Sequence, residues 1–355
     1  MGIAFDHTTL GQRVVFGTGQ GVENTVAQLA ELGSERVMLI AGVSAAETAD
    51  AIAARIPVAV RIGEVVQHVP VENANRATDA ALAHGVDAIL AVGGGSSTGL
   101  AKAVALRTAL PIVALPTTFA GSEATSVWGL TENERKTTGT DPRVLPKVVV
   151  YDAGLLTTLP SRLAKASGLN AIAHAIDGFW APRADPINRA MGTEGLGALV
   201  GGLRALPSGE IDAVEQTLYG AYLAAVAFAS AGSGMHHKIC HVLGGRFGLN
   251  HAELHAVVLG YVTAFNAPAA PDAARRVSQA FDGVPAGEAL FRFRAEIGAP
   301  TSLAELGLAE RDLPEAAALA LEAIPPSNPR PVTQAELEKL LRLAWAGEPV
   351  SKGQL

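Results

Sequence analysis

The chain has 355 residues, of which 49% are hydrophobic and 17% charged, and it carries a net charge of −7. This composition excludes a disordered chain, and the length predicts two domains. The acidic balance, without any run of five basic residues, argues against nucleic acid as a partner.

The first part of the chain alternates short apolar runs with stretches of helical spacing. The stretches 23–32 and 73–84 carry apolar residues at helical intervals. Nearly continuous apolar strands separated by helices are typical of a parallel sheet covered on both faces. We therefore expect an α/β dinucleotide-binding domain with a doubly wound parallel sheet over residues 1–155. The predicted strands are 14–16, 37–40, 58–60, 88–92, 112–115 and 148–150.

Residues 156–355 are predicted to form an all-helical catalytic domain. The β-branched runs stop near residue 157, and Ala, Leu and Gly predominate from there on. Thr333 and Glu336 have the spacing of a capping box, which predicts the start of a last helix. The segment 324–331 contains four prolines and is predicted to be a loop. The first three predicted helices are 163–180, 186–203 and 212–231.

Two features bear on where the protein works. The single cysteine, Cys240, excludes a disulfide framework and favours a reducing compartment. The first residues lack the basic and apolar regions of an export signal, and the longest weakly polar run, 219–232, is shorter than a membrane-spanning helix. We expect a cytoplasmic protein without a membrane partner.

A glycine-rich turn follows the predicted strand 88–92. Gly93, Gly94, Gly95 and Ser96 lead into a helix-like stretch, so unpaired backbone N–H groups and a helix dipole would face an anion there. A plain tight turn would also use glycine. Three glycines followed by two hydroxyls exceed what a turn requires, and we interpret them as a phosphate site. The pattern matches neither GxGxxG nor a nucleotide triphosphatase loop.

Two further strand ends are candidates for cofactor binding. The run 112–115 is followed by a loop that contains Thr117, Thr118 and Ser122. Ligands of open α/β sheets lie beyond the carboxyl ends of the strands, so this loop and the glycine turn would line one crevice. The run 37–40 is followed by Gly42, with no acidic residue before Glu47, so this strand does not distinguish NAD from NADP.

A group of polar residues in the helical half forms the candidate catalytic site. Asn170 and His174 are four residues apart, His237 and His241 repeat that spacing, and a glycine-rich turn precedes His251. Each histidine alone is explained by a hydrogen-bonded core position. Together they indicate a converging site, because three imidazoles can hold Zn²⁺ or Fe²⁺. The residues interpreted as packing or supporting are His236, His255 and Cys240.

These motifs resemble the iron-containing (group III) alcohol dehydrogenase superfamily over nearly the whole chain. The similar segments are 93–96 with Ala101 and Lys102, 116–118 with 121–123, 168–174, and the histidines at 237, 241 and 251. The resemblance implies a nucleotide domain, a helical domain and an active site in the cleft between them. It also implies NADH or NADPH as the cofactor. If a metal binds, the implied ligands are Asn170, His174, His237 and His251.

Two departures favour one branch of that superfamily, the maleylacetate reductases. Asn170 and Gly99 stand where the metal-dependent dehydrogenases have Asp, and the segments 95–100, 118–123 and 236–241 are also similar to this branch. Replacing a carboxylate by an amide removes the only anionic ligand and weakens metal binding. We therefore expect a site that does not require a metal.

The resemblance implies reduction of the carbon–carbon double bond of maleylacetate by NAD(P)H, giving 3-oxoadipate in the degradation of aromatic compounds. The partner is then a small dicarboxylate, and a homodimer is the default assembly. Protonated imidazoles could stabilise the enolate and supply the proton. The alternatives are a metal-dependent alcohol, glycerol or hydroxy-acid dehydrogenase and a lyase similar to dehydroquinate synthase.

Overall fold

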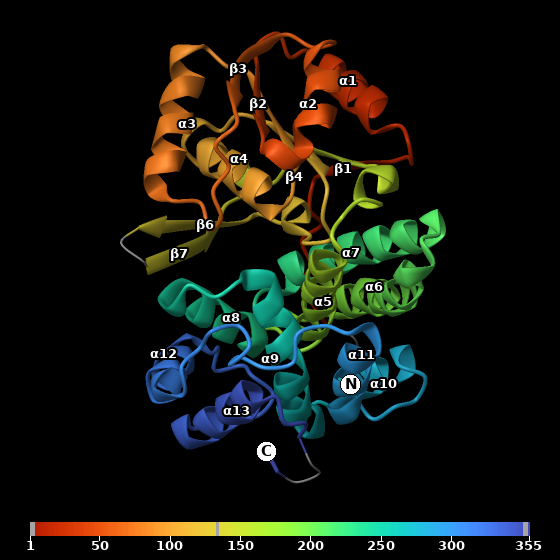
Figure 1. Ribbon diagram of the computed structural model, residues 1–355, viewed down its shortest axis with the longest axis vertical. Helices are drawn as coiled ribbons and strands as arrows, with labels where there is room; N and C mark the ends of the chain where they lie inside the picture. The colour runs from red at the N-terminus through yellow and green to blue at the C-terminus, as the bar shows by residue number, and fades with distance from the viewer. Residues whose placement is uncertain (1–3, 133–134, 351–353) are drawn as a thin grey trace. The chain divides into compact units, whose positions relative to one another are not determined.

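The computed structural model describes residues 4–132, 135–350 and 354–355, which divide into two compact units. One unit runs from Leu10 to Leu159, and the other contains the described residues before Leu10 and after Leu159. The sequence pattern divides the chain after residue 155, whereas packing divides it after Leu159. Each unit is coloured along the chain in Figure 1.

The unit from Leu10 to Leu159 is built on a six-stranded parallel sheet of order β1-β8-β5-β4-β2-β3. All six predicted strands are confirmed, and so is the doubly wound fold. The strands are β1 Arg13–Phe16, β2 Val37–Ala41, β3 Val58–Ile62, β4 Ala88–Gly93, β5 Ile112–Pro116 and β8 Val148–Tyr151. The α-helices are α1 Gly21–Glu31, α2 Ala46–Ala53, α3 Val71–Ala83 and α4 Gly95–Thr108. Short 3₁₀ helices, labelled η, are η1 Val43–Ala45, η2 Ser122–Ala124, η3 Pro142–Val144 and η4 Ala153–Leu156.

Both faces of this sheet are covered by helices (Figure 1). Along β2, Val37 and Leu39 pack with residues of α1 and α2, whereas Met38 and Ile40 pack with residues of α3 and α4. Successive side chains of a strand point to opposite faces, so an apolar run without alternation needs helices on both sides. This packing aligns the carboxyl ends of β2, β4 and β5 at one edge of the sheet.

This unit also contains an antiparallel hairpin that the sequence pattern does not predict. Its strands are β6 Val127–Glu132 and β7 Arg135–Thr140. The segment reads as polar and threonine-rich, and β6 is only partly buried, so it has no apolar run to mark it. A Cβ added at Gly139 would lie 2.6 Å from the Trp128 ring, which shows that the indole packs directly on the opposite strand.

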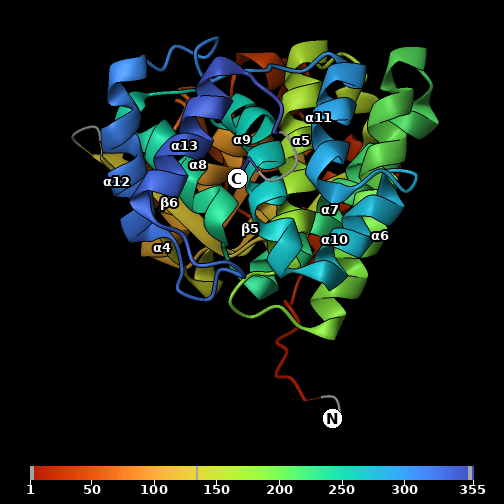
Figure 2. The same cartoon turned by 90° about the horizontal axis from the view of Figure 1, so that it is seen from below.

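The second unit contains no strand among its described residues, as predicted. In this unit α9 packs against α5, α8, α11 and α13 (Figure 2). Thr333 and Glu336 form the predicted capping box, and 324–331 contains no helix. The helices are α5 Ser161–Gly178, α6 Pro186–Ala205, η5 Leu206–Ser208, α7 Ile211–Ala231, α8 Met235–Phe247, α9 His251–Asn266, η6 Ala267–Ala269, α10 Pro271–Ala280, α11 Ala286–Ile297, η7 Glu310–Asp312, α12 Leu313–Ala323 and α13 Gln334–Ala346.

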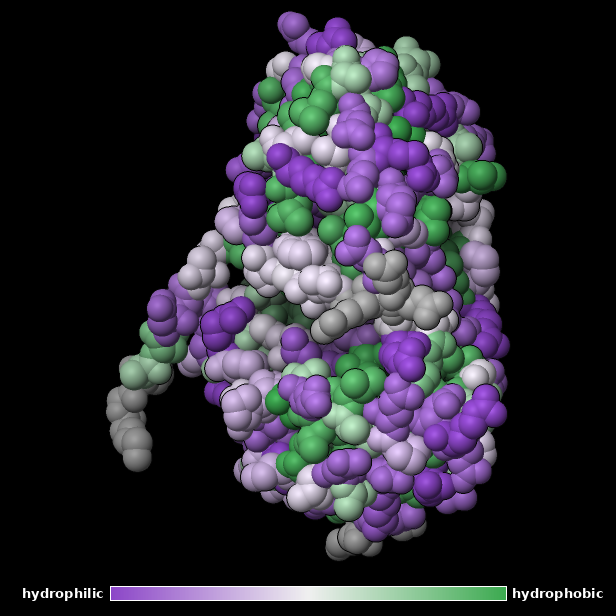
Figure 3. Space-filling view, turned by 90° about the vertical axis from the view of Figure 1, so that its left-hand side faces the viewer, coloured by the Kyte–Doolittle hydropathy of each residue, from purple (hydrophilic) through white to green (hydrophobic). Residues whose placement is uncertain are grey.

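Within the described residues no single helix is long and apolar enough to cross a membrane. The pair α7 and α8 passes that test only when the two helices are taken together, and they are bent by 97°. On the face drawn in Figure 3, hydrophilic residues are interspersed among hydrophobic ones.

Helices α6 and α7 approach each other closely through glycine, which gives a stability prediction. A Cβ at Gly202 would lie 2.4 Å from Thr217 Oγ1 and 2.7 Å from Thr217 N, whereas one at Gly197 would meet nothing within 4 Å. Gly202→Ala is expected to destabilise the fold by about 1–3 kcal/mol, because the backbones must separate.

Gly197→Ala is the matched control on the same helix. It is expected to be neutral or to stabilise by roughly 0.5–1 kcal/mol, because alanine favours a helix over glycine. Denaturant unfolding of both variants measures the difference. Equal midpoints for the two variants would contradict this account of the α6–α7 packing.

Candidate active site

The glycine turn after β4 has a conformation that only glycine fits. Gly93 has a φ of +138°, and a Cβ there would lie 2.4 Å from Ser97 Oγ. A Cβ at Gly94 would lie 2.9 Å from Thr118 Cγ2, in the loop after β5. The Thr117 N–H donates to the Gly93 carbonyl at 3.1 Å. The structure therefore brings the predicted cofactor residues of the turn after β4 and of the loop after β5 into contact with one another.

The turn leads directly into α4, which begins at Gly95. The first N–H groups of a helix have no helical acceptor, and the helix dipole places partial positive charge there. Gly95 is exposed and Ser96 partly so, while the strand before them is buried. This end of α4 is therefore able to bind a phosphate group.

Gly42 follows β2, the neighbour of β4 in the sheet. Its φ is −77°, which any residue adopts, and an added Cβ would meet only Val65 at an ordinary 3.6 Å. Neither backbone nor packing demands glycine at this position. The absence of a side chain leaves space at the edge where the carboxyl ends of β2, β4 and β5 align.

The predicted catalytic residues cluster in the helical unit. His174 of α5 stacks on His237 of α8, with ring centroids 5.0 Å apart. His237 and His241 are 6.3 Å apart, and His241 stacks on His251, the first residue of α9, at 5.8 Å. Asn170 lies buried one turn before His174 on α5. Three helices thus bring together residues that the sequence separates by up to 81 positions, from 170 to 251.

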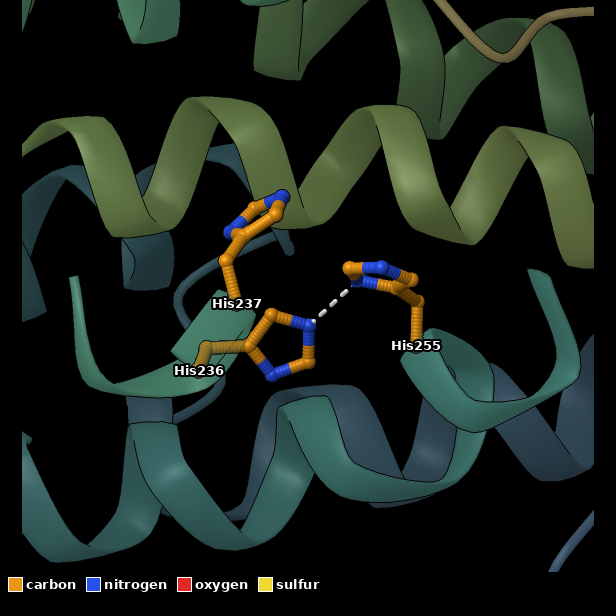
Figure 4. A group of neighbouring side chains, drawn as sticks. All are labelled: His236, His237 and His255. Atoms are coloured by element: carbon orange, nitrogen blue, oxygen red, sulfur yellow. Dashed lines mark hydrogen bonds between the residues drawn. The ribbon is translucent and has the colours of Figure 1, made fainter. Parts of the chain in front are cut away.

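Two histidines interpreted from the sequence as supporting residues join this cluster. His236 Nε2 and His255 Nδ1 are hydrogen-bonded at 2.8 Å, beside the ring of His237 (Figure 4). His255 Nε2 in turn lies 3.2 Å from His251 Nε2. Cys240 Sγ is 3.7 Å from His236 Nε2. The site therefore continues inward as a chain of hydrogen-bonded imidazoles.

Asp177 is the functional residue that sequence reasoning missed. It is completely buried on α5 and accepts a hydrogen bond from His237 Nδ1 at 2.8 Å. The same carboxylate accepts from the Gly234 N–H at 2.9 Å and from Trp180 Nε1 at 3.1 Å. An acidic residue in an otherwise apolar helix, three positions after His174, is the signal that could have revealed it.

The hydrogen bond to Asp177 fixes the tautomer of His237. Nδ1 carries the proton that is donated to the carboxylate, so Nε2 keeps its lone pair. Nε2 of His237 and Nδ1 of His174 are buried and make no hydrogen bond within the part of the chain that the structure describes. A buried polar atom without a partner is costly, which points to a ligand at these positions.

Burial keeps the deep imidazoles neutral. It lowers the pKa of His174 to about 4 and holds the pKa values of His236, His237 and His255 well below the ordinary value. Burial also raises the pKa of the Cys240 thiol, which argues against a thiolate nucleophile. Neutral imidazole is the form that binds a metal ion.

The donor set therefore fits a divalent transition metal. His236, His237 and His255 have nitrogen atoms within 4.8 Å of one another, and His174 stacks on the same group. A histidine whose second ring nitrogen is held by a carboxylate is the usual supporting arrangement around a bound metal. The Asp177–His237 pair has that arrangement.

Comparison with known proteins places this geometry in a family. Residues 11–153 match the sequence model "Iron-containing alcohol dehydrogenase", and residues 164–345 match "Fe-containing alcohol dehydrogenase family, C-terminal". A maleylacetate reductase of Delftia acidovorans is 43% identical over 97% of this chain and 99% of its own length.

Two solved structures show the same fold. An iron-containing alcohol dehydrogenase from Corynebacterium glutamicum is 50% identical, covers 98% of both chains and has a TM-score of 0.94. A maleylacetate reductase from Agrobacterium tumefaciens is 39% identical, covers 98% of this chain and 99% of its own, and has a TM-score of 0.92.

These matches correct one expectation from the sequence. The prediction that no metal is required is wrong, because both sequence models describe a family that normally uses iron. The substitution at Asn170 removes one anionic ligand but leaves the neutral imidazoles in place. The chain belongs to the iron-containing alcohol dehydrogenase family.

Proposed function

We propose that this protein is a maleylacetate reductase, which uses NADH or NADPH to reduce the carbon–carbon double bond of maleylacetate to 3-oxoadipate. The observation that carries the proposal is the 39–43% identity, over nearly the full length, to enzymes named maleylacetate reductase. The clustered imidazoles provide the acid–base groups that this reduction needs. We further propose a cytoplasmic homodimer.

The proposed cofactor site is the edge of the sheet where β2, β4 and β5 end. The pyrophosphate of the dinucleotide would lie on the N–H groups at the start of α4, because that helix end favours negative charge. Hydroxyls from the loop after β5 add neutral donors next to it. The residues proposed to bind the cofactor are Gly42, Gly93, Gly94, Gly95, Ser96, Thr117, Thr118 and Ser122.

The proposed reaction is a conjugate reduction. NADH or NADPH, when bound, would supply a hydride to the carbon β to the ketone and become NAD⁺ or NADP⁺, and the π electrons of the double bond would move to the ketone oxygen to give an enolate. Protonation of the carbon between them completes 3-oxoadipate. The protein must therefore stabilise an oxyanion and deliver one proton.

The proposed proton donor is one of the two partly buried imidazoles, His241 and His251; when a metal is bound, His251 is one of its ligands and His241 is the donor. Both lie in the cluster and stack on each other, while the deeper rings are kept neutral by burial. A proton donor must regain its proton from water after each turnover, so a ring near solvent suits the role better than a fully buried one.

A metal, when bound, would be held by Asn170, His174, His237 and His251, and His236 and His255 would support this set through the hydrogen bonds that join them to His251. The metal would act as a Lewis acid toward the oxygen that gains negative charge. The part played by this chain's own residues is orientation. Asp177 holds His237 in one tautomer, and the stacking with His174 fixes the plane of its ring.

A second function is favoured by one observation. The solved structure at 50% identity is described as an iron-containing alcohol dehydrogenase, so reduction of simple aldehydes or ketones is the competing activity. A conjugated double bond and an isolated carbonyl are chemically distinct acceptors for hydride, which makes the two functions separable by substrate.

The first prediction concerns the substrate. Loss of NADH and NADPH absorbance should be rapid with maleylacetate and slow with simple aldehydes and ketones, and the product should be 3-oxoadipate. Turnover of the aldehydes without turnover of maleylacetate would establish the alcohol dehydrogenase instead. A dehydroquinate-synthase-like lyase would consume no NADH with any of these substrates.

The second prediction concerns the proton donor. Replacing His241 or His251 by Ala is expected to lower kcat by roughly 10²-fold for the residue that acts as the general acid. His84→Ala is the matched control, since His84 is an exposed histidine of the other unit. Near-normal turnover in both site variants would exclude these imidazoles from the reaction.

The third prediction concerns Asn170. Asn170→Asp is expected to raise the affinity for Zn²⁺ or Fe²⁺, because a carboxylate is an anionic ligand and an amide is not. Changes to residues around a metal site alter metal affinity by roughly 10–100-fold, and a new anionic ligand should have at least that effect. Calorimetric titration of the chelator-treated protein measures it without reference to activity. An unchanged dissociation constant would show that Asn170 does not contact the metal.

A further inference from the structure

Lys102 is a fully buried basic residue that the proposed reaction does not use. It lies in the middle of α4, with only 1% of its surface exposed. Its three N–H donors are shared among four oxygens within hydrogen-bond distance, all from one short segment, 122–127. These acceptors are Ser122 O at 2.6 Å, Thr125 O at 2.8 Å, Val127 O at 2.8 Å and Thr125 Oγ1 at 3.0 Å.

The segment 122–127 is wrapped around this charge. Three carbonyl oxygens that converge on one point repel one another unless a cation lies between them. Burying an ammonium group is costly, and burial lowers the pKa of Lys102 to about 7. Hydrogen bonds from the charged form to four oxygens offset this cost, because such bonds are about twice as strong as neutral ones.

The two ends of this interaction belong to the two loops of the proposed cofactor site. Lys102 is on the helix whose first residues, Gly95 and Ser96, are proposed to bind the pyrophosphate. The segment that surrounds its ammonium begins at Ser122, in the loop after β5. The loops also touch through the Thr117–Gly93 hydrogen bond and through Thr118, which packs on Gly94.

The far side of the segment is anchored independently. Glu123 accepts a hydrogen bond from the Tyr151 hydroxyl at 2.7 Å, and its backbone carbonyl accepts one from Gln12 at 2.8 Å. Burial raises the pKa of Glu123, and the nearby positive charge of Lys102 opposes that rise. The segment is therefore held between the sheet on one side and the ammonium on the other.

We propose that Lys102 is a positioning residue for cofactor binding: its ammonium holds the segment 122–127 in the conformation that places Thr118 and Ser122 beside the N-terminus of α4. Lys102 itself is enclosed by protein and acts through these two residues. The identity of the cofactor as NADH or NADPH rests on the proposed function.

The test compares Lys102→Met with the wild type. Methionine has similar length but no charge or donor, so three carbonyls lose their partner. The dissociation constant for NADH, measured by fluorescence titration, is expected to rise about tenfold or more, as the loss of hydrogen bonds from a charged group predicts. At saturating NADH, kcat with maleylacetate should change by less than about threefold, because the reacting groups are untouched.

Three further variants make the result specific. Lys102→Arg keeps the positive charge and is expected to restore part of the affinity for NADH. Lys147→Met removes an exposed lysine of the same unit and should leave the dissociation constant unchanged. Thr125→Val removes one of the four acceptors of Lys102, together with the bonds of that hydroxyl to Ser122 O and to the Val127 N–H. The three carbonyl acceptors remain, so the protein should fold and show a smaller loss of NADH affinity even if Lys102→Met does not fold.

The proposal is overturned if folded Lys102→Met, or Thr125→Val where the former does not fold, binds NADH as tightly as the wild type. A lowered melting temperature with unchanged NADH affinity would likewise assign Lys102 to stability alone. Wild-type protein that binds NADH but does not reduce maleylacetate would overturn the proposed function and leave this inference standing, because its readout is cofactor binding.

Discussion

The helical unit depends on one buried carboxylate of α5 that accepts hydrogen bonds from the start of α8. Asp177 of α5 accepts from the backbone of Gly234 and from the ring of His237, at the start of α8. A Cβ at Gly234 would lie 2.3 Å from Asp177 Oδ1, so only glycine allows this approach. Without the carboxylate, the buried His237 would lose the partner that fixes its tautomer, and the start of α8 would lose an acceptor for its free N–H group.

The unit from Leu10 to Leu159 contains a similar arrangement with the opposite charge. There the buried group is the ammonium of Lys102, and its partners are carbonyl oxygens rather than N–H groups. In both units a glycine permits the backbone to come close, Gly234 beside Asp177 and Gly94 beside Thr118. In each unit, a single buried charge thus binds backbone groups of a short irregular segment. No helix or sheet would otherwise provide hydrogen-bond partners for these groups.

The sequence predicts the regular elements well because burial on both faces demands uninterrupted apolar strands. It predicts the cluster of His174, His237, His241 and His251 because helical spacing and turn residues are local features. The hairpin β6–β7 is not predicted, since β6 is only partly buried and therefore needs no apolar run. The position of Asp177 in the cluster is not predicted for a different reason. Its partners lie 57 and 60 positions away, and their approach depends on how α5 packs against α8.

The difference between local sequence features and contacts made by packing also explains the mistaken expectation about the metal. Asn170 read alone suggests a weakened site, because an amide oxygen is a poorer ligand than a carboxylate. The affinity of a metal site also depends on the protonation state and orientation of its imidazoles, which burial and the Asp177 hydrogen bond determine here. Neutral, correctly oriented imidazoles can bind a divalent metal ion even without an anionic ligand. A single substitution therefore does not decide whether a metal is used, whereas the packing around the ligands bears on it directly.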